Sequence, residues 1–264
     1  ELSSAISELG YTEMTPVQAL TLPLLLAEPT DFLGLAATGT GKTAAFGIPM
    51  IERIDGTLRA AQGLVICPTR ELALQVAQQL ELLGKNKKIR TVAIYGGASY
   101  GDQIRGLKQG AQIIIATPGR LIDHLERGTV DLSKVKTIVL DEADEMISMG
   151  FKDEIEGILE KMPAGSFNTW LFSATMSKEV RRVADRFLSE PEMVQINKTE
   201  MLSGTVEQIY YKVRESDKPD ILCKLIEQAD DFYGLIFCQT KSLVVDLTEV
   251  LRARGYKVDR SEER

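Results

Sequence analysis

The sequence predicts an α/β fold in which a mostly parallel β-sheet carries helices on both faces. Short runs rich in Val, Ile and Leu show little polar alternation, as strands covered on both faces do. These runs are residues 32–36, 63–67, 91–95, 112–116, 137–140 and 169–172. Longer amphipathic stretches lie between them and predict helices, the clearest at 43–54, 71–83 and 178–188. Ligands of such sheets collect at the carboxyl ends of the strands.

The composition is that of an ordinary globular protein. The chain has 264 residues, of which 44% are apolar and 26% charged, and this excludes a disordered or collagen-like chain. No apolar run approaches the ~18 residues of a membrane span, and the first residues do not resemble a secretory signal. The net charge of −7 argues against a generally basic nucleic-acid coat and leaves a local basic groove open.

The spacing of the cysteines and the single histidine does not predict a zinc site. Cys67, Cys223 and Cys238 lie far apart, so with His124 they give no Cys/His zinc site of the usual spacing. Each cysteine ends or flanks an apolar run, which favours buried thiols in a reducing compartment. We therefore expect a cytoplasmic protein, in which His124 is a surface or packed residue of a helix.

The chain is expected to divide near residue 200. Residues 1–198 form the predicted first lobe, residues 199–204 are polar and read as a linker, and residues 205–264 begin the strand–helix pattern again. In this last part the pattern predicts strands at 206–213 and 234–237 and helices at 218–229 and 242–254. Only 60 residues follow Gly204, so we expect the second lobe to be incomplete.

A phosphate-binding loop follows the first predicted strand. Residues 36–43 read Ala-Ala-Thr-Gly-Thr-Gly-Lys-Thr and match the P-loop pattern except for Ala36, which replaces a glycine. Backbone N–H groups of such a loop approach phosphate oxygens at the start of a helix. Lys42 is expected to reach the β- and γ-phosphates, and the Thr43 hydroxyl to bind Mg²⁺. The loop residues expected to cradle the nucleotide are Thr38, Gly39, Thr40 and Gly41.

Acidic residues follow the predicted strand at 137–140. A carboxylate at a strand end beside a phosphate loop suits Mg²⁺, so Asp141 is expected to hold the metal directly or through water. Glu142 is placed to orient or deprotonate a water for in-line attack. An acidic helix start is the alternative reading, and the neighbouring phosphate loop favours the catalytic one.

These two elements and their surroundings resemble the DEAD-box family of ATP-dependent RNA helicases, and most closely its bacterial cold-shock and ribosome-assembly type. Asp141 to Asp144 match the tetrapeptide that names the family. Further matches follow in family order at residues 10–18, 68–73, 96–97, 117–120, 173–175 and 235–240. The resemblance implies a RecA-like ATP-binding lobe followed by the start of a second RecA-like lobe.

The resemblance also implies a role for each motif. RNA is expected to contact Pro68, Thr69, Arg70, Gly96, Gly97, Thr117, Pro118, Gly119 and Arg120, mostly through its backbone and thus with little sequence preference. Residues 117–120 alone are also a good helix start. Ser173 and Thr175 are expected to bond to the acidic motif at Asp144 and to link the ATP state to RNA binding; small residues packed at a strand end are the alternative.

The family's adenine site corresponds to Tyr11 and Gln18. An amide makes two hydrogen bonds to the N6/N7 edge of adenine, so Gln18 favours ATP over GTP, and the resemblance places Tyr11 near the base. Thr15 to Gln18 also form a capping box with proline at the first helical position. Both roles stay open for Gln18.

The expected protein is an ATP-dependent RNA helicase or ribonucleoprotein remodeller with an RNA-stimulated ATPase. It is expected to use ATP and Mg²⁺, bind RNA and no membrane, separate short duplexes locally and hydrolyse ATP to release the RNA. The alternative is an ATP-gated RNA clamp that does not unwind. A GTPase or a transporter ATPase is disfavoured, because residues 197–200 and 202–204 only approach their signatures. No segment matches the family's arginine finger, so we expect this chain alone to hydrolyse ATP negligibly.

Overall fold

The computed structural model describes residues 2–162, 167–196, 209–229 and 231–260. The chain divides into two compact units, residues 1–203 and 204–264. The expected linker at 199–204 lies outside the described residues, as do the signature-like segments at 197–200 and 202–204. Within the described residues, no helix is long and apolar enough to cross a bilayer.

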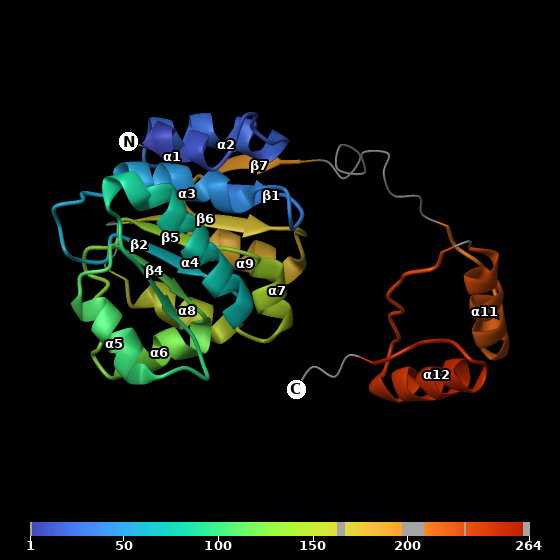
Figure 1. Ribbon diagram of the computed structural model, residues 1–264. Coiled ribbons are helices and arrows are strands. Elements are labelled where there is room, and N and C mark those ends of the chain that lie inside the picture. Colours follow the sequence, from blue (N-terminus) through green and yellow to red (C-terminus); the bar gives the residue numbers. More distant parts are fainter. Residues whose placement is uncertain (1, 163–166, 197–208, 230, 261–264) are drawn as a thin grey trace. The chain divides into compact units, whose positions relative to one another are not determined.

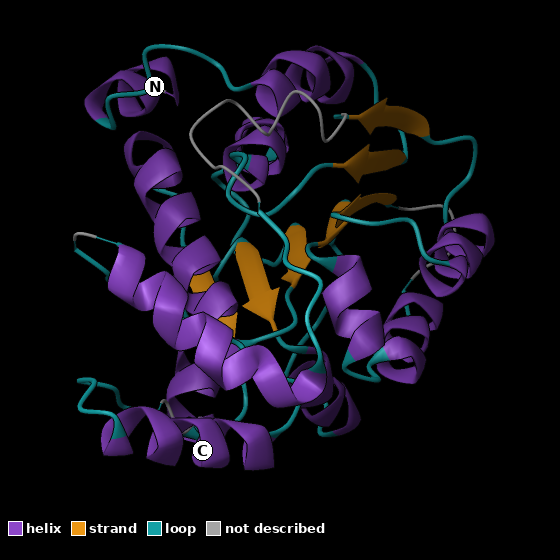
Figure 2. Cartoon of the chain, turned by 90° about the vertical axis from the view of Figure 1, so that its right-hand side faces the viewer, coloured by secondary structure: helices purple, strands orange, loops and turns teal. Residues whose placement is uncertain are grey.

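The first unit is built on a parallel seven-stranded sheet with the strand order β3-β4-β2-β5-β6-β1-β7 (Figures 1 and 2). The fold class and all of the expected strands of this unit are confirmed to within a residue or two. The strands are β1 (Phe32–Leu35), β2 (Gly63–Ile66), β3 (Thr91–Ile94), β4 (Ile113–Ala116), β5 (Thr137–Leu140), β6 (Asn168–Ser173) and β7 (Glu192–Gln195).

Helices cover both faces of this sheet. One face carries α1 (Leu2–Glu8), α2 (Pro16–Ala27), α3 (Lys42–Arg53) and α4 (Arg70–Gly84). The other carries α5 (Tyr100–Lys108), α6 (Pro118–Glu126), α7 (Ala143–Ser148), α8 (Lys152–Glu160) and α9 (Lys178–Phe187). Successive strand side chains alternate between the two cores, so Trp170 packs in the first and Leu171 in the second.

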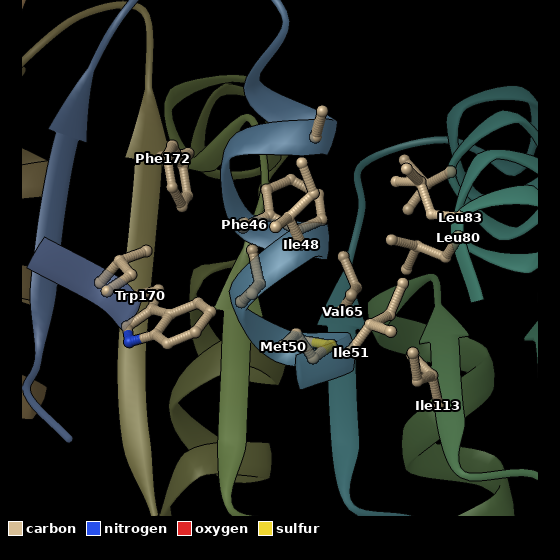
Figure 3. Packing of buried hydrophobic residues seen from close by; sticks show 14 of the residues in the cluster. Phe46, Ile48, Met50, Ile51, Val65, Leu80, Leu83, Ile113, Trp170 and Phe172 are labelled. Carbon is tan, nitrogen blue, oxygen red and sulfur yellow. The ribbon is translucent and has the colours of Figure 1, made fainter. Parts of the chain in front are cut away.

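The core beneath α3 is dense and shows why this helix lies flat on the sheet. Phe46 and Met50 of α3 meet Trp170 and Phe172 of β6 in Figure 3, and the rings of Phe46 and Phe172 are 5.4 Å apart. Glycine at position 47 lets α4 approach, since a Cβ there would lie 2.4 Å from the Leu80 side chain. The packing fixes the start of α3, and with it the phosphate loop.

The second unit contains η2 (Glu215–Asp217), α11 (Lys218–Gln228) and α12 (Lys241–Ala253), so both expected helices are confirmed. The strand expectation is wrong for residues 209–213 and 234–237, which have no regular structure. Leu235 and Phe237 are 86% and 91% exposed. A parallel strand bonds only through neighbouring strands, and two strands alone form no stable sheet.

Two of the thiols are buried as expected. Cys67 directly follows β2 and lies in the first core. Cys223 lies in α11, where its sulfur accepts a hydrogen bond from Arg254. The expectation is wrong for Cys238, which is only partly buried because it follows the unpaired segment 234–237.

Candidate functional site

The phosphate loop joins the end of β1 to the start of α3. Gly41 caps the helix with a φ of 92°, a left-handed conformation that glycine adopts without strain. A Cβ at this position would lie 2.6 Å from the Gln18 amide nitrogen. The Thr40 hydroxyl donates to the Ala37 carbonyl at 2.8 Å and closes the turn. Glycine is therefore required at 41 by both backbone conformation and space.

Lys42 and Asp141 lie at this end of the sheet with polar atoms that have no partner. The two residues are only 5% and 2% exposed. Among the described residues, three buried side-chain polar atoms lack a hydrogen bond: Thr21 Oγ1, Lys42 Nζ and Asp141 Oδ1. Burying such groups costs about 1–3 kcal/mol each. Unpaired polar atoms of this kind mark a place where a ligand completes the bonding.

Opposing influences act on the charge of Asp141. Burial raises the pKa of its carboxyl group to about 6, although the positive charge of Lys42 favours the ionised form. Asp141 follows β5, and its backbone N–H bonds to the Ile66 carbonyl at the end of β2. The carboxylate thus lies beside a cation but lacks the solvation that it has in water.

The oxygens near Lys42 fit a magnesium ion held jointly with phosphate. No cluster of three or more His, Cys, Asp or Glu side chains in the described ranges offers a metal site of its own. Mg²⁺ uses few protein ligands and keeps waters and phosphate oxygens in its octahedral shell. The Asp141 carboxylate with its unpaired oxygen and the hydroxyl of Thr43, directly after Lys42, match that donor set.

Glu142 is held in a strained backbone conformation. Its φ and ψ are 55° and 52°, a left-handed geometry uncommon for residues other than glycine. The Thr38 hydroxyl donates to its carboxylate at 3.0 Å and so joins the phosphate loop to the start of α7. Strained residues concentrate at functional sites, and this one points its carboxylate at the loop expected to hold the phosphates.

Asp144 connects the acidic motif to the segment after β6. Its carboxylate accepts hydrogen bonds from the Thr175 hydroxyl at 2.8 Å and the Ala174 N–H at 3.3 Å. Burial pushes the pKa of Asp144 up, but hydrogen bonds led by those of Thr175 and Ser173 outweigh it and lower the pKa. The Ser173 hydroxyl also donates to the Thr175 carbonyl at 2.7 Å. The structure therefore brings the three predicted residues together.

Gln18 bridges its own helix start and the phosphate loop. Its side-chain oxygen accepts from the Thr15 N–H at 3.0 Å, which completes the capping box, and its amide nitrogen donates to the Gly41 carbonyl at 3.1 Å. Tyr11 accepts a hydrogen bond from Gln79 of α4 at 2.8 Å. Tyr11 and Gln18 line a cavity of about 550 Å³ whose apolar walls include Leu22 and Ile48.

The residues expected to contact RNA gather at the carboxyl ends of three adjacent strands. Ile66, Ala116 and Ile94 are paired across β2, β4 and β3 at these ends. The loops and helix starts that follow hold Pro68, Thr69 and Arg70, then Gly96 and Gly97, then Thr117, Pro118, Gly119 and Arg120. The arrangement presents the starts of α4, α5 and α6 along one end of the sheet.

The two arginines at this end of the sheet differ in their surroundings. Arg70 is exposed, and its guanidinium lies 5.1 Å from the centre of the Tyr95 ring. The Arg120 side chain is 11% exposed and donates to the Ala98 carbonyl at 3.1 Å and to Gln103 at 3.3 Å. The Arg70 guanidinium is therefore accessible to solvent, whereas the Arg120 guanidinium forms its hydrogen bonds within the protein.

Sequence reasoning missed several polar residues that organise these loops. Gln79 and Gln103 lie within helices, and nothing in the sequence separates them from ordinary surface glutamines. His124 was expected to be a surface or packed residue, and it is fully buried and hydrogen-bonded. Only the folded arrangement shows these partners, because each lies in a different element from the residue it contacts.

The sheet, the loop after β1 and the carboxylates after β5 define a P-loop nucleotide-binding protein with a RecA-like α/β fold. The chain belongs to the DEAD/DEAH box helicase family, since the model of that family matches residues 15–183. This confirms the resemblance found in the sequence.

Similar proteins extend over nearly the whole chain. The DEAD-box ATP-dependent RNA helicase CshA of Geobacillus kaustophilus is 47% identical over 98% of this chain and 55% of its own length. The protein of the same name from Bacillus subtilis is 46% identical, with 98% and 52% covered. The crystal structure of a DEAD box protein from Methanococcus jannaschii has a TM-score of 0.71 and 38% identity, with 96% of this chain and 68% of that one covered. The chain thus spans about half the length of these curated relatives.

Proposed function

We propose that this chain carries the ATP-binding lobe of an ATP-dependent RNA helicase, and that residues 205–264 begin a second RecA-like lobe. The observation that carries the proposal is the buried pair of unpaired polar atoms, Lys42 Nζ and Asp141 Oδ1, beside the phosphate loop. The names of the CshA relatives support the activity. ATP is the proposed nucleotide, with Gln18 and Tyr11 at its base.

The proposed chemistry uses residues at the ends of β1 and β5. Lys42 binds the terminal phosphates, while Thr43 and Asp141 hold Mg²⁺ directly or through water. The bound ion supplies positive charge that neutralises the phosphate oxygens. Glu142 leaves its Thr38 partner to orient a water and accept its proton. The Asp144–Thr175 bond couples this acidic motif to the segment after β6.

The proposed RNA site lies at the ends of β2, β4 and β3. Backbone N–H groups at helix starts bind phosphates, and the exposed Arg70 adds a positive charge. Contacts of this kind fix the position of a strand without reading bases, so little sequence preference is expected. ATP-dependent binding then bends one strand and separates a short duplex locally. We place the protein in the cytoplasm, where RNA and ATP are both present.

Nucleotide binding tests the proposal directly. The chain is titrated into a fluorescent ATP analogue with Mg²⁺, and unlabelled ATP and GTP compete for the site. Displacement by ATP and not by GTP is expected; equal competition would remove the proposed role of Gln18, and no binding would overturn the ATP site. A strand-displacement assay beside an RNA-binding assay then separates unwinding from a clamp that only binds.

A further inference from the structure

The buried amide of Gln103 joins three segments of the proposed RNA site. Gln103 lies in α5 and is 4% exposed. Its amide nitrogen donates to the Tyr95 carbonyl at 3.0 Å, at the end of β3. Its oxygen accepts from Arg120 at 3.3 Å and faces the His124 Nε2 atom at 3.0 Å, both in α6. One side chain therefore connects the end of β3 and α5 to the helix that starts at Pro118.

The neighbouring side chains close a packed cluster around this amide. The Arg120 guanidinium stacks on the Tyr100 ring at 4.2 Å from its centre and donates to the Ala98 carbonyl. The rings of Tyr100 and His124 are 4.9 Å apart. We call Tyr100, Gln103, Arg120 and His124 the Gln103 cluster. Because the cluster bonds to the Ala98 carbonyl, it holds the loop that follows Gly96 and Gly97.

The hydrogen-bonding pattern of the cluster is complete with a neutral histidine. The Gln103 nitrogen is committed to a carbonyl, so its oxygen must face His124, and we assign the proton of the ring to Nε2. Nδ1 then accepts from the Thr129 hydroxyl at 2.7 Å, while the His124 carbonyl, which this hydroxyl also faces at 3.1 Å, accepts from the Thr129 N–H at 3.0 Å. Burial, and next the positive charge of Arg120, lower the pKa of His124, which agrees with this assignment. A fully satisfied buried network fixes one arrangement.

We propose that Gln103 is a positioning residue that sets the loop at Gly96–Gly97 and the helix start at Thr117–Arg120 in a fixed relation for an RNA backbone, with Arg120 acting within the protein and not on phosphate. The proposal rests on the proposed RNA site and deepens it. The positions of backbone N–H groups decide whether successive phosphates are bound together, so a shift between the two loops weakens binding without removing any cation.

The salt dependence of RNA binding tests this role. Each cation that neutralises a phosphate of a single strand contributes about 0.7 to the slope of log affinity against log salt. Binding of a fluorescein-labelled oligouridine is followed by anisotropy at several KCl concentrations. The variants are Gln103→Leu, Arg120→Gln and Arg70→Ala. Gln109→Leu is the matched control, because Gln109 is exposed at the other end of α5.

We expect Gln103→Leu and Arg120→Gln to raise the dissociation constant about tenfold, the size of a lost buried hydrogen bond, with an unchanged salt slope. Arg70→Ala is expected to reduce the slope by about 0.7, and Gln109→Leu to bind as the parent does. Melting temperature and ATP-analogue affinity show whether each variant is folded. If Gln103→Leu does not fold, the RNA affinity and salt slope of Arg120→Gln test the proposal.

Each other outcome has a defined meaning. A slope reduced by Arg120→Gln would place the guanidinium on a phosphate and overturn the proposal. Parental RNA binding by folded Gln103→Leu or by Arg120→Gln would overturn it as well. A parent chain that does not bind the oligouridine would overturn the proposed RNA site and the positioning role together. If Arg70→Ala binds RNA as the parent does while Gln103→Leu binds it more weakly, Arg70 does not contact the RNA and the role of Gln103 is supported.

Discussion

The Thr38 hydroxyl donates a hydrogen bond of 3.0 Å to the Glu142 carboxylate, and this bond joins the phosphate loop to a residue with left-handed backbone geometry. The proposed catalytic carboxylate is thus held by the loop that is proposed to bind its substrate. The bond fixes the side chain, while the strain belongs to the backbone of Glu142. The two effects can be separated by substitution.

The strain at Glu142 predicts an unusual order of stabilities. A left-handed residue other than glycine costs about 1–2 kcal/mol, so Glu142→Gly is expected to unfold with a free energy about 1 kcal/mol higher than Glu142→Ala. Glu145, in the right-handed part of α7, is the control, and there glycine is expected to be about 1 kcal/mol less stable than alanine. Urea unfolding measures both pairs. The same order at both positions would show that Glu142 is not strained.

Removing Lys42 is expected to weaken nucleotide binding strongly without unfolding the lobe. Its ammonium group is buried and unpaired, so Lys42→Ala removes a group that contributes little to the core. We expect affinity for an ATP analogue to fall about 100-fold, as for the loss of a charged hydrogen bond. The melting temperature without nucleotide should shift by no more than about 4 °C. Lys134→Ala, at an exposed lysine, is the control; a large loss of stability in Lys42→Ala would contradict the role.

The raised pKa of Asp141 predicts how stability depends on pH. Its carboxyl group has a pKa of about 6 in the folded chain, against an ordinary value of 3.8. Between these values the folded state keeps a proton that the unfolded state has lost. The contribution of Asp141 is therefore full below pH 3.8 and is lost as the pH rises through 6, by about 3 kcal/mol at most.

Asp141→Asn isolates this contribution, because asparagine does not titrate. As the pH rises from 4 to 7, the unfolding free energy of the parent is expected to fall relative to that of Asp141→Asn. Urea unfolding without nucleotide or metal, at several pH values in this range, measures it. A difference that stays constant across the range would show that folding does not raise the pKa of Asp141.

The contact between α3 and α4 predicts a penalty at Gly47. Although alanine favours helices, Gly47→Ala is expected to destabilise the chain by about 1–3 kcal/mol, because its Cβ would overlap Leu80. The penalty should disappear in a Leu80→Ala background, and a double-mutant cycle measures this. Gly157→Ala in α8 meets only an ordinary contact at 3.9 Å and should stabilise by up to about 1 kcal/mol. A stabilising Gly47→Ala would refute the close packing.

The sequence predicted the part of the fold that depends on local pattern. Buried strands such as β2 and β5 are continuous apolar runs, so their position follows from composition alone. β7 has a single buried residue, Val194, and lies at the edge of the described sheet beside β1. Its sequence is therefore not a continuous apolar run, and it was not predicted. The strands expected around Tyr210 and Leu235 had the right composition but have no partner strand among the described residues. Pairing between distant segments is not visible in a local run.

The same distinction applies to the candidate site. Lys42 and Asp141 were predicted because each belongs to a motif that follows a predicted strand. Arg120 was predicted to contact RNA, and its contacts with Ala98 and Gln103 were not foreseen because they depend on segments that follow a neighbouring strand. Gln103 itself carries no signal, because its importance arises only from the three groups that surround it.

The strand order puts the two halves of the site in separate blocks of the sheet. β3, β4 and β2 carry the loops proposed for RNA, while β5, β6 and β1 carry those proposed for the nucleotide. Only the boundary between β2 and β5 is shared. Substitutions in the loops proposed for RNA can therefore leave the loops proposed for the nucleotide in place, and the reverse holds as well.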